Sequence, residues 1–434
     1  MICYHRVMFR KNYAIILLTF ILVGTFFCAE VDASAERESF YVDPSYDIYS
    51  RDEVDAELLK STDSLYFYVE EDWWSGISSN SQEDAEKVIE DLSLEFEETI
   101  YPVLTSEYGS EWSPGIDGDE KITVLIHPLR GAASGYFSNG NEYSRYQSPS
   151  SNEREMIYLD ARRIMDDIAN SYLAHEFVHL ITFNQKERLK GVQEEVWLNE
   201  ARAEYASTLC GYNKEYEGSY LKTRVGDFLR NPTDSITEWQ GGAKDYGALS
   251  LFIHYLADHY GEDILSDSMA SSEAGIKSIN EALEKNGFSE RFSDIFVDWT
   301  IAVFVNDCSL GEKYCYLNEN LKDLRVVPQS NFLPISSRSV LSVFYQTKDW
   351  AGSWHKIFGG KGNLSFEFDG EGRADFKVPY ILCPQNNQCS IGFLELNSNQ
   401  KGELGIADFG EEYNYITIIP LVREKESGFG SSEA

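Results

Sequence analysis

Two histidines, His175 and His179, stand four positions apart in a segment that has the pattern of a helix. At this spacing both imidazoles project from one face of the helix, so a single metal ion can bind both of them. Glu176 lies about 100° further round the helix, beside the position where a metal-bound water would sit. The sequence His-Glu-x-x-His therefore predicts a metal site with a carboxylate next to its open position.

The segment 194–207 offers a third ligand, since it contains neither Gly nor Pro and indicates a second helix. Glu200 follows His179 by 21 positions, which leaves room for a return helix to bring a carboxylate back to the metal. Glu195 is the nearby competitor for this role. Glu204, one turn beyond Glu200, can hydrogen-bond a liganding imidazole, or alternatively pair with Lys or Arg on the surface. Two histidines and one glutamate leave a fourth tetrahedral position open, which is typical of catalytic zinc.

In these residues the chain resembles the gluzincin metallopeptidases, the thermolysin-like group. Their pattern is His-Glu-x-x-His followed, after a comparable interval, by Asn-Glu-x-x-x-Asp. Here the second part begins at Asn199 and has Glu204 in place of the Asp. The resemblance implies that Glu176 is the general base and that Asn199 and Glu204 orient the ligand histidines. It also implies three zinc ligands, which are His175, His179 and Glu200.

Over roughly residues 60–310 the sequence is most similar to the hyicolysin-type secreted metallopeptidases, through residues 135–137 and 151–160 as well as the two helices. The resemblance implies an α+β, bilobal zincin-type catalytic domain over residues 61–320. Such a domain has a strand-and-helix lobe, a helical lobe and the metal in the cleft. In gluzincins a sheet edge beside the metal helix pairs with the substrate backbone. Residues 135–137 stand where that edge is expected, with a flexible loop as the alternative.

An oxyanion formed during hydrolysis needs a hydrogen-bond donor opposite the glutamate, and gluzincins supply it from the second lobe. Tyr246 is the candidate, with His254, Tyr255 and His259 as alternatives. The Gly-x-Met-x-Asn segment by which gluzincin aminopeptidases hold a free amine does not precede the metal helix. The chain is therefore expected to be an endopeptidase that attacks peptide bonds with a metal-activated water.

Two other kinds of function are compatible with the same motif. A zinc hydrolase of a non-peptide substrate would have an identical metal site. A catalytically silent surface-binding protein would instead use the C-terminal region. The intact base at Glu176 argues against the silent protein, because an inactive site need not retain it.

The 434 residues carry a formal net charge of −35. Such an acidic surface repels nucleic acid phosphates and anionic membranes, so neither is expected as a partner. The expected partner is a protein or peptide substrate, and the chain is expected to be a monomer. The charge also fits a protein that binds Ca²⁺. Asp117 and Asp119 are candidate ligands, although a plain turn is the favoured interpretation.

Residues 1–35 have the pattern of a secretory signal peptide, with an uncleaved anchor as the alternative. Basic residues precede an uncharged run over residues 13–29, and Ala33-Ser34-Ala35 is a suitable cleavage site. The mature protein is therefore expected outside the cell, where disulfides form. Cysteine spacing predicts the pairs Cys308–Cys315 and Cys383–Cys389 and leaves Cys210 unpaired.

Hydrophobic periodicity indicates the elements that position the motif. After an extended lead-in over residues 36–60, strands are expected at 65–69, 122–126 and 156–160. Helices are expected at 81–108, 164–184, 244–260, 276–286 and 291–306. Short alternating strands, such as 364–368 and 415–419, predict a separate C-terminal β-sandwich over residues 325–425.

Overall fold

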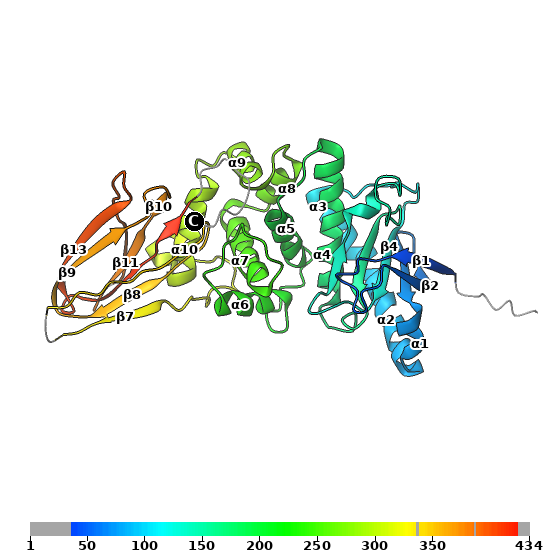
Figure 1. Ribbon diagram of the computed structural model, residues 1–434, viewed down its shortest axis with the longest axis horizontal. Coiled ribbons are helices and arrows are strands. Elements are labelled where there is room, and N and C mark those ends of the chain that lie inside the picture. The colour runs from blue at the N-terminus through cyan, green and yellow to red at the C-terminus, as the bar shows by residue number, and fades with distance from the viewer. Residues whose placement is uncertain (1–35, 336–337, 386–387, 424–434) are drawn as a thin grey trace, which may run out of the picture. The chain divides into compact units, whose positions relative to one another are not determined.

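The computed structural model describes residues 36–335, 338–385 and 388–423, and Figure 1 shows their arrangement. Helices and several β-sheets are both present, so the fold is of the mixed α+β class that the sequence predicts. The expected signal peptide, residues 1–35, lies outside the described residues. Within the described part of the chain, no helix is long and apolar enough to cross a membrane.

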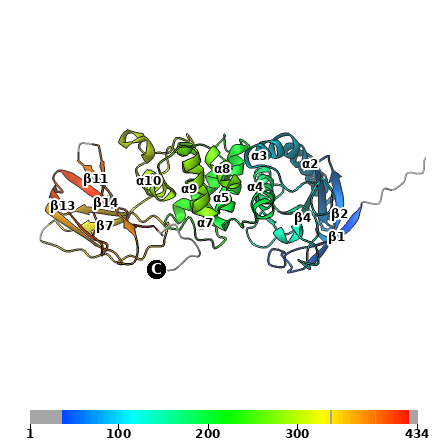
Figure 2. The same cartoon turned by 90° about the horizontal axis from the view of Figure 1, so that it is seen from above.

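A six-stranded sheet occupies the N-terminal part of the chain (Figures 1 and 2). Its strands, in spatial order, are β1 (Arg37–Tyr41), β2 (Glu53–Ser61), β3 (Leu65–Glu70), β4 (Ile122–His127), β6 (Met156–Asp160) and β5 (Gly135–Phe137). The central strands β3, β4 and β6 are parallel, and the other pairings are antiparallel. Strand β5 ends this order, so residues 135–137 form an edge of the sheet.

Residues 36–60 contain β1 and nearly all of β2, whereas the sequence predicts an extended lead-in. Strand β1 pairs with the first half of β2 in antiparallel register. Only Phe40, Val54 and Ala56 of these two strands are buried. So few buried apolar positions give a weak period-two pattern, and the strands are therefore hard to recognise in the sequence.

Alternating side chains along β3 give the sheet two buried faces. Leu65 and Phe67 face a large hydrophobic core, while Tyr68 faces a smaller cluster formed with the N-terminal segment. The large core includes residues of α2 (Ser79–Glu95), α3 (Tyr101–Tyr108) and α4 (Ala169–Thr182). A π-helical turn, Phe96–Ile100, joins α2 to α3. The single long helix predicted over residues 81–108 is thus confirmed.

The chain beyond α4 is helical up to residue 305. The predicted helices are present within about two residues of their expected ends. They are α5 (Val196–Leu209), α7 (Ala243–Tyr260), α9 (Gly275–Lys285) and α10 (Phe292–Val305). Two more helices, α6 (Tyr220–Arg230) and α8 (Asp263–Ala270), were not predicted. All these helices contribute to the same large core.

The described chain beyond residue 325 is built of strands. A seven-stranded sheet contains β12-β11-β14-β13-β9, with β8 paired to β14 and β7 to β8, and β10 pairs with β15. The strands are β7 (Gln329–Leu333), β8 (His355–Gly359), β9 (Gly362–Asp369), β10 (Phe376–Lys377), β11 (Pro379–Pro384), β12 (Ser390–Phe393), β13 (Lys401–Phe409), β14 (Tyr413–Ile418) and β15 (Leu421–Val422). Ile406 of β13 and Ile416 of β14 share one hydrophobic cluster with side chains of β9 and β11.

Two disulfides close short loops in this second half of the chain. Cys308 is bonded to Cys315 and Cys383 to Cys389, with Cα–Cα distances of 5.0 and 4.1 Å. Both predicted pairings are confirmed. Cys210 is free and partly buried. Disulfides are compatible with an extracellular location, because thiols stay reduced in the cytosol.

Candidate metal centre

Helix α4 carries His175, Glu176 and His179 through the interior of the protein. Its apolar side chains are 0–1% exposed and pack in the large core; they are Leu173, Phe177, Leu180 and Ile181. This packing fixes the rotation of α4 about its own axis. The two histidines, 6% and 7% exposed, therefore point away from the core and toward α5.

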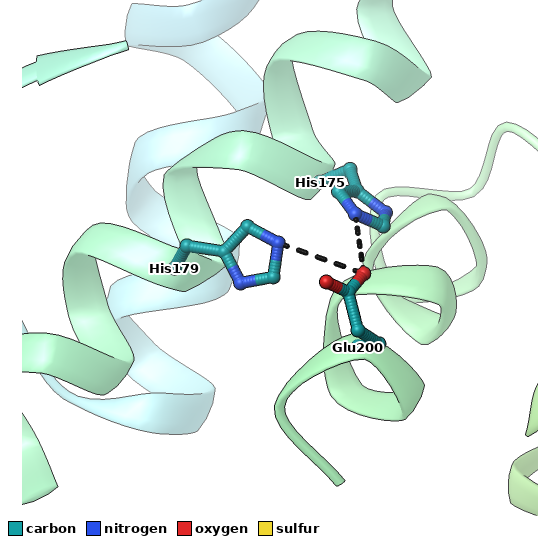
Figure 3. Close-up of side chains that lie close together, drawn as sticks. All are labelled: His175, His179 and Glu200. Carbon is teal, nitrogen blue, oxygen red and sulfur yellow. Dashed lines mark ion pairs between the residues drawn. The ribbon is translucent and has the colours of Figure 1, made fainter. Parts of the chain in front are cut away.

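Glu200 of α5 places its carboxylate between the two imidazoles (Figure 3). Its Oε2 atom lies 3.2 Å from Nε2 of His175 and 3.8 Å from Nε2 of His179. One possible ligand atom from each of the three residues lies within 4.8 Å of the other two. The structure thus brings together the three residues expected to bind metal.

The second nitrogen of each imidazole faces an oxygen on α5. Nδ1 of His179 lies 3.1 Å from Oδ1 of Asn199, which can accept its proton in a hydrogen bond. Nδ1 of His175 lies 3.5 Å from Oε1 of Glu204. A proton held on Nδ1 leaves the lone pair of Nε2 free for a metal ion. Asn199 is therefore hydrogen-bonded to His179, whereas Glu204 lies at ion-pair distance from His175, whose buried Nδ1 has no hydrogen bond among the described residues.

Glu204 is held in turn by α6. Nε of Arg224 donates to its Oε2 at 2.7 Å, and Nη2 donates to its Oε1 at 2.9 Å. The hydroxyl of Tyr220 also donates to Oε1, at 2.9 Å. Glu204 is 1% exposed, so these charged and polar contacts compensate its burial. The alternative in which Glu204 pairs with a cation on the surface does not occur.

Tyr220 and Arg224 were missed in the sequence. Helix α6 does carry a start signal, because the Ser219 side chain accepts a hydrogen bond from the backbone N–H of Lys222. Buried apolar residues follow at helical spacing, at Leu221, Val225 and Phe228. These features indicate a helix, but nothing in them points to Glu204.

The carboxylate of Glu176 packs against the edge strand β5. A Cβ atom at Gly135 would lie 2.8 Å from Oε1 of Glu176, so a larger residue does not fit without movement. Burial raises the pKa of Glu176 to about 8; the charge of His175 opposes this rise, and Glu200 and Glu204 add to it. A carboxyl group with such a pKa can accept and release a proton near neutral pH.

The three predicted ligands are electrostatically coupled. Burial lowers the pKa of His175, but the contact with Glu200 and the nearby carboxylates outweigh it and raise that pKa to about 9. Burial also lowers the pKa of His179. Burial would raise the pKa of Glu200, but the two histidines lower it. The site thus attracts positive charge, and a bound cation would displace the proton of His175.

The donor set fits a metal ion. Oε2 of Glu200 is buried without a normal hydrogen bond in the described chain, although it lies close to both Nε2 atoms. Two imidazole nitrogens and a carboxylate oxygen are preferred zinc ligands. An ion contacting all three would satisfy this oxygen.

Tyr246, in the first turn of α7, lies beside the predicted ligands. Its ring centroid is 6.2 Å from that of His175, and the guanidinium carbon of Arg224 is 4.4 Å from its ring centroid. Burial and the carboxylates of Glu200 and Glu204 raise the pKa of Tyr246 well above its ordinary value. The phenol therefore keeps its proton and is a hydrogen-bond donor.

The alternative donors make contacts elsewhere. Nδ1 of His254 lies 2.6 Å from the Ser250 carbonyl, and its Nε2 is 2.7 Å from the Thr208 hydroxyl. The hydroxyl of Tyr255 donates to the carbonyl of Lys313, and Nε2 of His259 lies 2.9 Å from the carbonyl of Cys315. Of the four candidates, Tyr246 is the one in ring contact with His175.

The Asp117–Asp119 segment forms a turn, as favoured from the sequence. The backbone N–H of Asp119 donates to Oδ1 of Asp117 at 3.0 Å, and Gly118 between them has φ +77°. The Tyr66 hydroxyl donates to Oδ2 of Asp119. The two carboxylates therefore accept hydrogen bonds from different donors.

No protein-family model and no curated protein matches the chain. Among solved structures, the chain has a similarity to a 4-O-methyl-alpha-glucuronidase with specificity for decorated arabinogalactans, at 8% sequence identity and a TM-score of 0.11. The matched region covers 72% of this chain and 51% of that one, so the chain spans about half the length of that protein. A TM-score this low supports no conclusion about fold or function.

Proposed function

We propose that this protein is a zinc-dependent endopeptidase. The observation that carries the proposal is the convergence of His175, His179 and Glu200 from two helices, with Glu176 alongside. Three protein ligands leave a fourth coordination position for water or substrate, as catalytic zinc requires. The similarity of these residues to the gluzincin motif supports a peptide bond as the substrate.

Each residue then has a chemical role. A zinc ion held here would lower the pKa of a water molecule to about 7 and polarise the substrate carbonyl. Glu176 accepts the proton of the attacking water and delivers it to the leaving amine. Asn199 and Glu204 keep the protons of His179 and His175 on Nδ1, so that both Nε2 atoms remain ligands.

The substrate backbone binds along β5 in this proposal. The free edge of this strand offers unpaired N–H and C=O groups to an extended peptide. Phe137 of β5 lies over His179, with ring centroids 6.4 Å apart. A peptide on this edge would therefore pass beside the metal. Tyr246, on the helical side, would donate a hydrogen bond from its hydroxyl to the oxyanion.

The same proposal assigns the larger architecture. The six-stranded sheet with α2 to α4 is one lobe of a zincin, and α5 to α10 form the other. The catalytic domain predicted over residues 61–320 then also includes β1 and β2, which begin at Arg37. The C-terminal strands belong to the β-sandwich predicted over residues 325–425. Secretion is supported by the signal pattern in residues 1–35 and by the two disulfides.

Cleavage of unlabelled casein by purified protein tests the proposal. We expect fragments to form, a zinc chelator to stop the reaction and added Zn²⁺ to restore it. Glu176→Gln should lower kcat by at least about 10²-fold while binding zinc normally, because it removes only the base. Glu367→Gln, an exposed change on β9, is the control and should behave as wild type.

The outcomes separate the competing functions. Turnover of an ester but not of casein, lost on chelation, would indicate a zinc hydrolase with a non-peptide substrate. Equal behaviour of Glu176→Gln and wild type in every assay would favour a silent binding protein. Failure of wild-type protein to bind zinc would exclude the metal centre itself.

A further inference from the structure

Three tyrosine rings form a continuous stack at the edge of the six-stranded sheet. Tyr158 of β6 and Tyr136 of β5 are register partners, and their ring centroids lie 4.1 Å apart at an interplanar angle of 6°. Tyr46, in the turn between β1 and β2, stacks on Tyr136 with centroids 4.5 Å apart and an angle of 14°. Tyr136 and Tyr158 are buried, whereas Tyr46 is 39% exposed. The stack therefore runs from the buried sheet out to solvent.

The order of the rings places Tyr46 beyond the free edge of β5. Two rings that are both nearly parallel to Tyr136 at these distances would overlap if they shared one of its faces, so they lie on opposite faces. Tyr158 belongs to the strand on one side of β5. Tyr46 consequently lies on the other side, where no strand of the described chain pairs with β5. Its distance from Tyr136 is close to the spacing of about 4.8 Å between neighbouring strands. The ring of Tyr46 thus stands where a side chain of an added strand would stand.

The turn that carries Tyr46 is anchored to the sheet. Asp47 is completely buried, and its carboxylate accepts hydrogen bonds from the backbone N–H of Tyr49 and from Nη2 of Arg51, both at 2.8 Å. The carbonyl of Tyr46 accepts a hydrogen bond from the backbone N–H of Arg130 at 2.6 Å. Because these contacts fix the backbone, an incoming peptide would meet the Tyr46 ring in a defined place.

Tyr46 is also close to the candidate metal centre. Gly135, which directly precedes Tyr136, lies against the carboxylate of Glu176. Burial raises the pKa of Tyr46, and the negative charges of Glu176 and Glu200 add to this rise. The ring therefore borders the part of the β5 edge that a substrate would follow past the metal.

Strand geometry decides which substrate residue meets Tyr46. Side chains alternate between the two faces along a strand, and a residue directly opposite Tyr136 would point to the same face as Tyr136. Its two neighbours would point to the other face, where Gly135 and Phe137 lie beside side chains of α4. One substrate position would therefore face the Tyr46 ring, while the positions before and after it face the metal side.

We propose that Tyr46 restricts the substrate residue opposite Tyr136 to a small side chain, such as Gly, Ala or Ser. A small side chain ends below the ring, whereas a Leu or Phe side chain would occupy the same space as the ring. This inference rests on the proposed endopeptidase function and on substrate binding along β5. It assigns specificity to a turn that carries neither a predicted metal ligand nor the base.

Cleavage of a mixed peptide library by wild-type protein, with the fragments sequenced, tests the proposal without any variant. We expect one position close to the cut to accept small residues and to disfavour Leu and Phe by about 10- to 100-fold in kcat/KM, because overpacking opposes the larger side chains. The absence of such a position, or a preference for aromatic residues there, would overturn the proposal. Wild-type protein that cuts no peptide would contradict the proposed function itself, and this inference would fall with it.

Substitutions in the turn identify the ring as the cause. Tyr46→Ala should accept Leu and Phe at the same position almost as well as Ala, whereas Tyr46→Phe keeps the ring and should retain the wild-type preference. Tyr49→Ala is the matched control, since Tyr49 is 69% exposed in the same turn and its ring packs against the guanidinium of Arg51.

Each protein is characterised by the ratio of kcat/KM for two peptides that differ at this one position. A general loss of stability or of zinc lowers both values and leaves their ratio unchanged. An unchanged ratio in Tyr46→Ala would overturn the proposal. The same change of ratio in Tyr46→Phe or in Tyr49→Ala would also overturn it, because the ring of Tyr46 is present in both.

Discussion

Oε1 of Glu204 lies 3.5 Å from Nδ1 of His175, while Nε2 of the same ring faces Glu200. The imidazole is thus held between two carboxylates on one helix, one turn apart. Arg224 and Tyr220 fix Glu204 from α6, so the orientation of His175 depends on a helix that carries none of the predicted ligands. If the site binds zinc as proposed, its affinity should depend on residues that do not contact the ion.

Glu204→Gln should weaken zinc binding. The amide retains the shape of the carboxylate but not its charge, so it stabilises the Nδ1 proton of His175 less well and leaves Arg224 with Asp227 as its remaining ion partner. We expect zinc affinity to fall by about 10- to 100-fold, measured by competition with a chromophoric chelator.

Glu195→Gln is the matched control for this change. Glu195 precedes α5, and its carboxylate accepts a hydrogen bond from the indole of Trp197, not from a predicted ligand. The Glu195→Gln variant should bind zinc with wild-type affinity. Equal affinities for the two variants would show that Glu204 does not orient the metal site.

Gly135→Ala should reduce catalysis while leaving zinc in place. The new Cβ atom would lie 2.8 Å from both Oε1 of Glu176 and the backbone carbonyl of Tyr158, so the base or the edge strand must move. A displacement of about 1 Å near reacting groups can cost on the order of 10²-fold in rate. Steady-state kinetics on a peptide substrate, with zinc content measured in parallel, gives the result.

Gly76→Ala serves as the comparison for Gly135→Ala. Gly76 ends α1 (Glu71–Gly76), and a Cβ atom there meets nothing within 4 Å. Its kinetics should match wild type. An active Gly135→Ala variant would mean that Glu176 tolerates displacement, which is incompatible with its role as the base.

Local patterns in the sequence were sufficient to predict which three side chains come together at the candidate metal centre. The interval of four between His175 and His179 places both on one helical face, whatever the rest of the fold. The return helix was predicted because an uninterrupted segment surrounds Glu200. The structure places these three side chains together.

The support for this centre was not predictable in the same way. Arg224 contacts Glu204 from 20 positions away in the chain, and this contact depends on how α6 packs against α5 and α7. Strands β1 and β2 were missed because their buried positions are few. The sequence reveals periodicity within an element, but not which polar side chains two separate elements bring together.

The stability of the protein should fall on mild acidification because of His254. Burial lowers the pKa of His254 to about 4, whereas the unfolded chain has a value near 6.5. The native state therefore holds the ring neutral. Its contribution to stability is complete above about pH 6.5 and is lost as the pH falls toward 4. Between about pH 7 and pH 5 this amounts to about 2 kcal/mol.

His254→Gln isolates this contribution. The variant has no titrating ring at this position, so its unfolding free energy should change less with pH than that of wild type. Urea unfolding at several pH values gives the slope of the unfolding free energy against pH for wild type and for the variant. Comparing the two slopes removes any constant difference in stability between the proteins. Identical slopes would show that the native state accommodates the protonated ring.

A pair of glycine substitutions should separate helix packing from helix propensity. Gly247 of α7 lies against α6, and a Cβ atom there would be 2.5 Å from the backbone nitrogen of Phe228. Backbone cannot yield as a side chain does, so Gly247→Ala should destabilise the protein by about 1–3 kcal/mol. It should also weaken zinc binding, because Tyr246 and Arg224 are displaced with the two helices.

Gly226→Ala, in the interior of α6, has the opposite expectation. The nearest atom to its new Cβ is 3.7 Å away, on the side chain of Arg230, so no clash opposes the gain in helix propensity. The variant should be more stable than wild type by about 0.5–1 kcal/mol. Urea unfolding of both variants measures their free energies of unfolding relative to wild type. If Gly247→Ala were as stable as Gly226→Ala, the close approach of α6 to α7 would not be what holds Arg224 on Glu204.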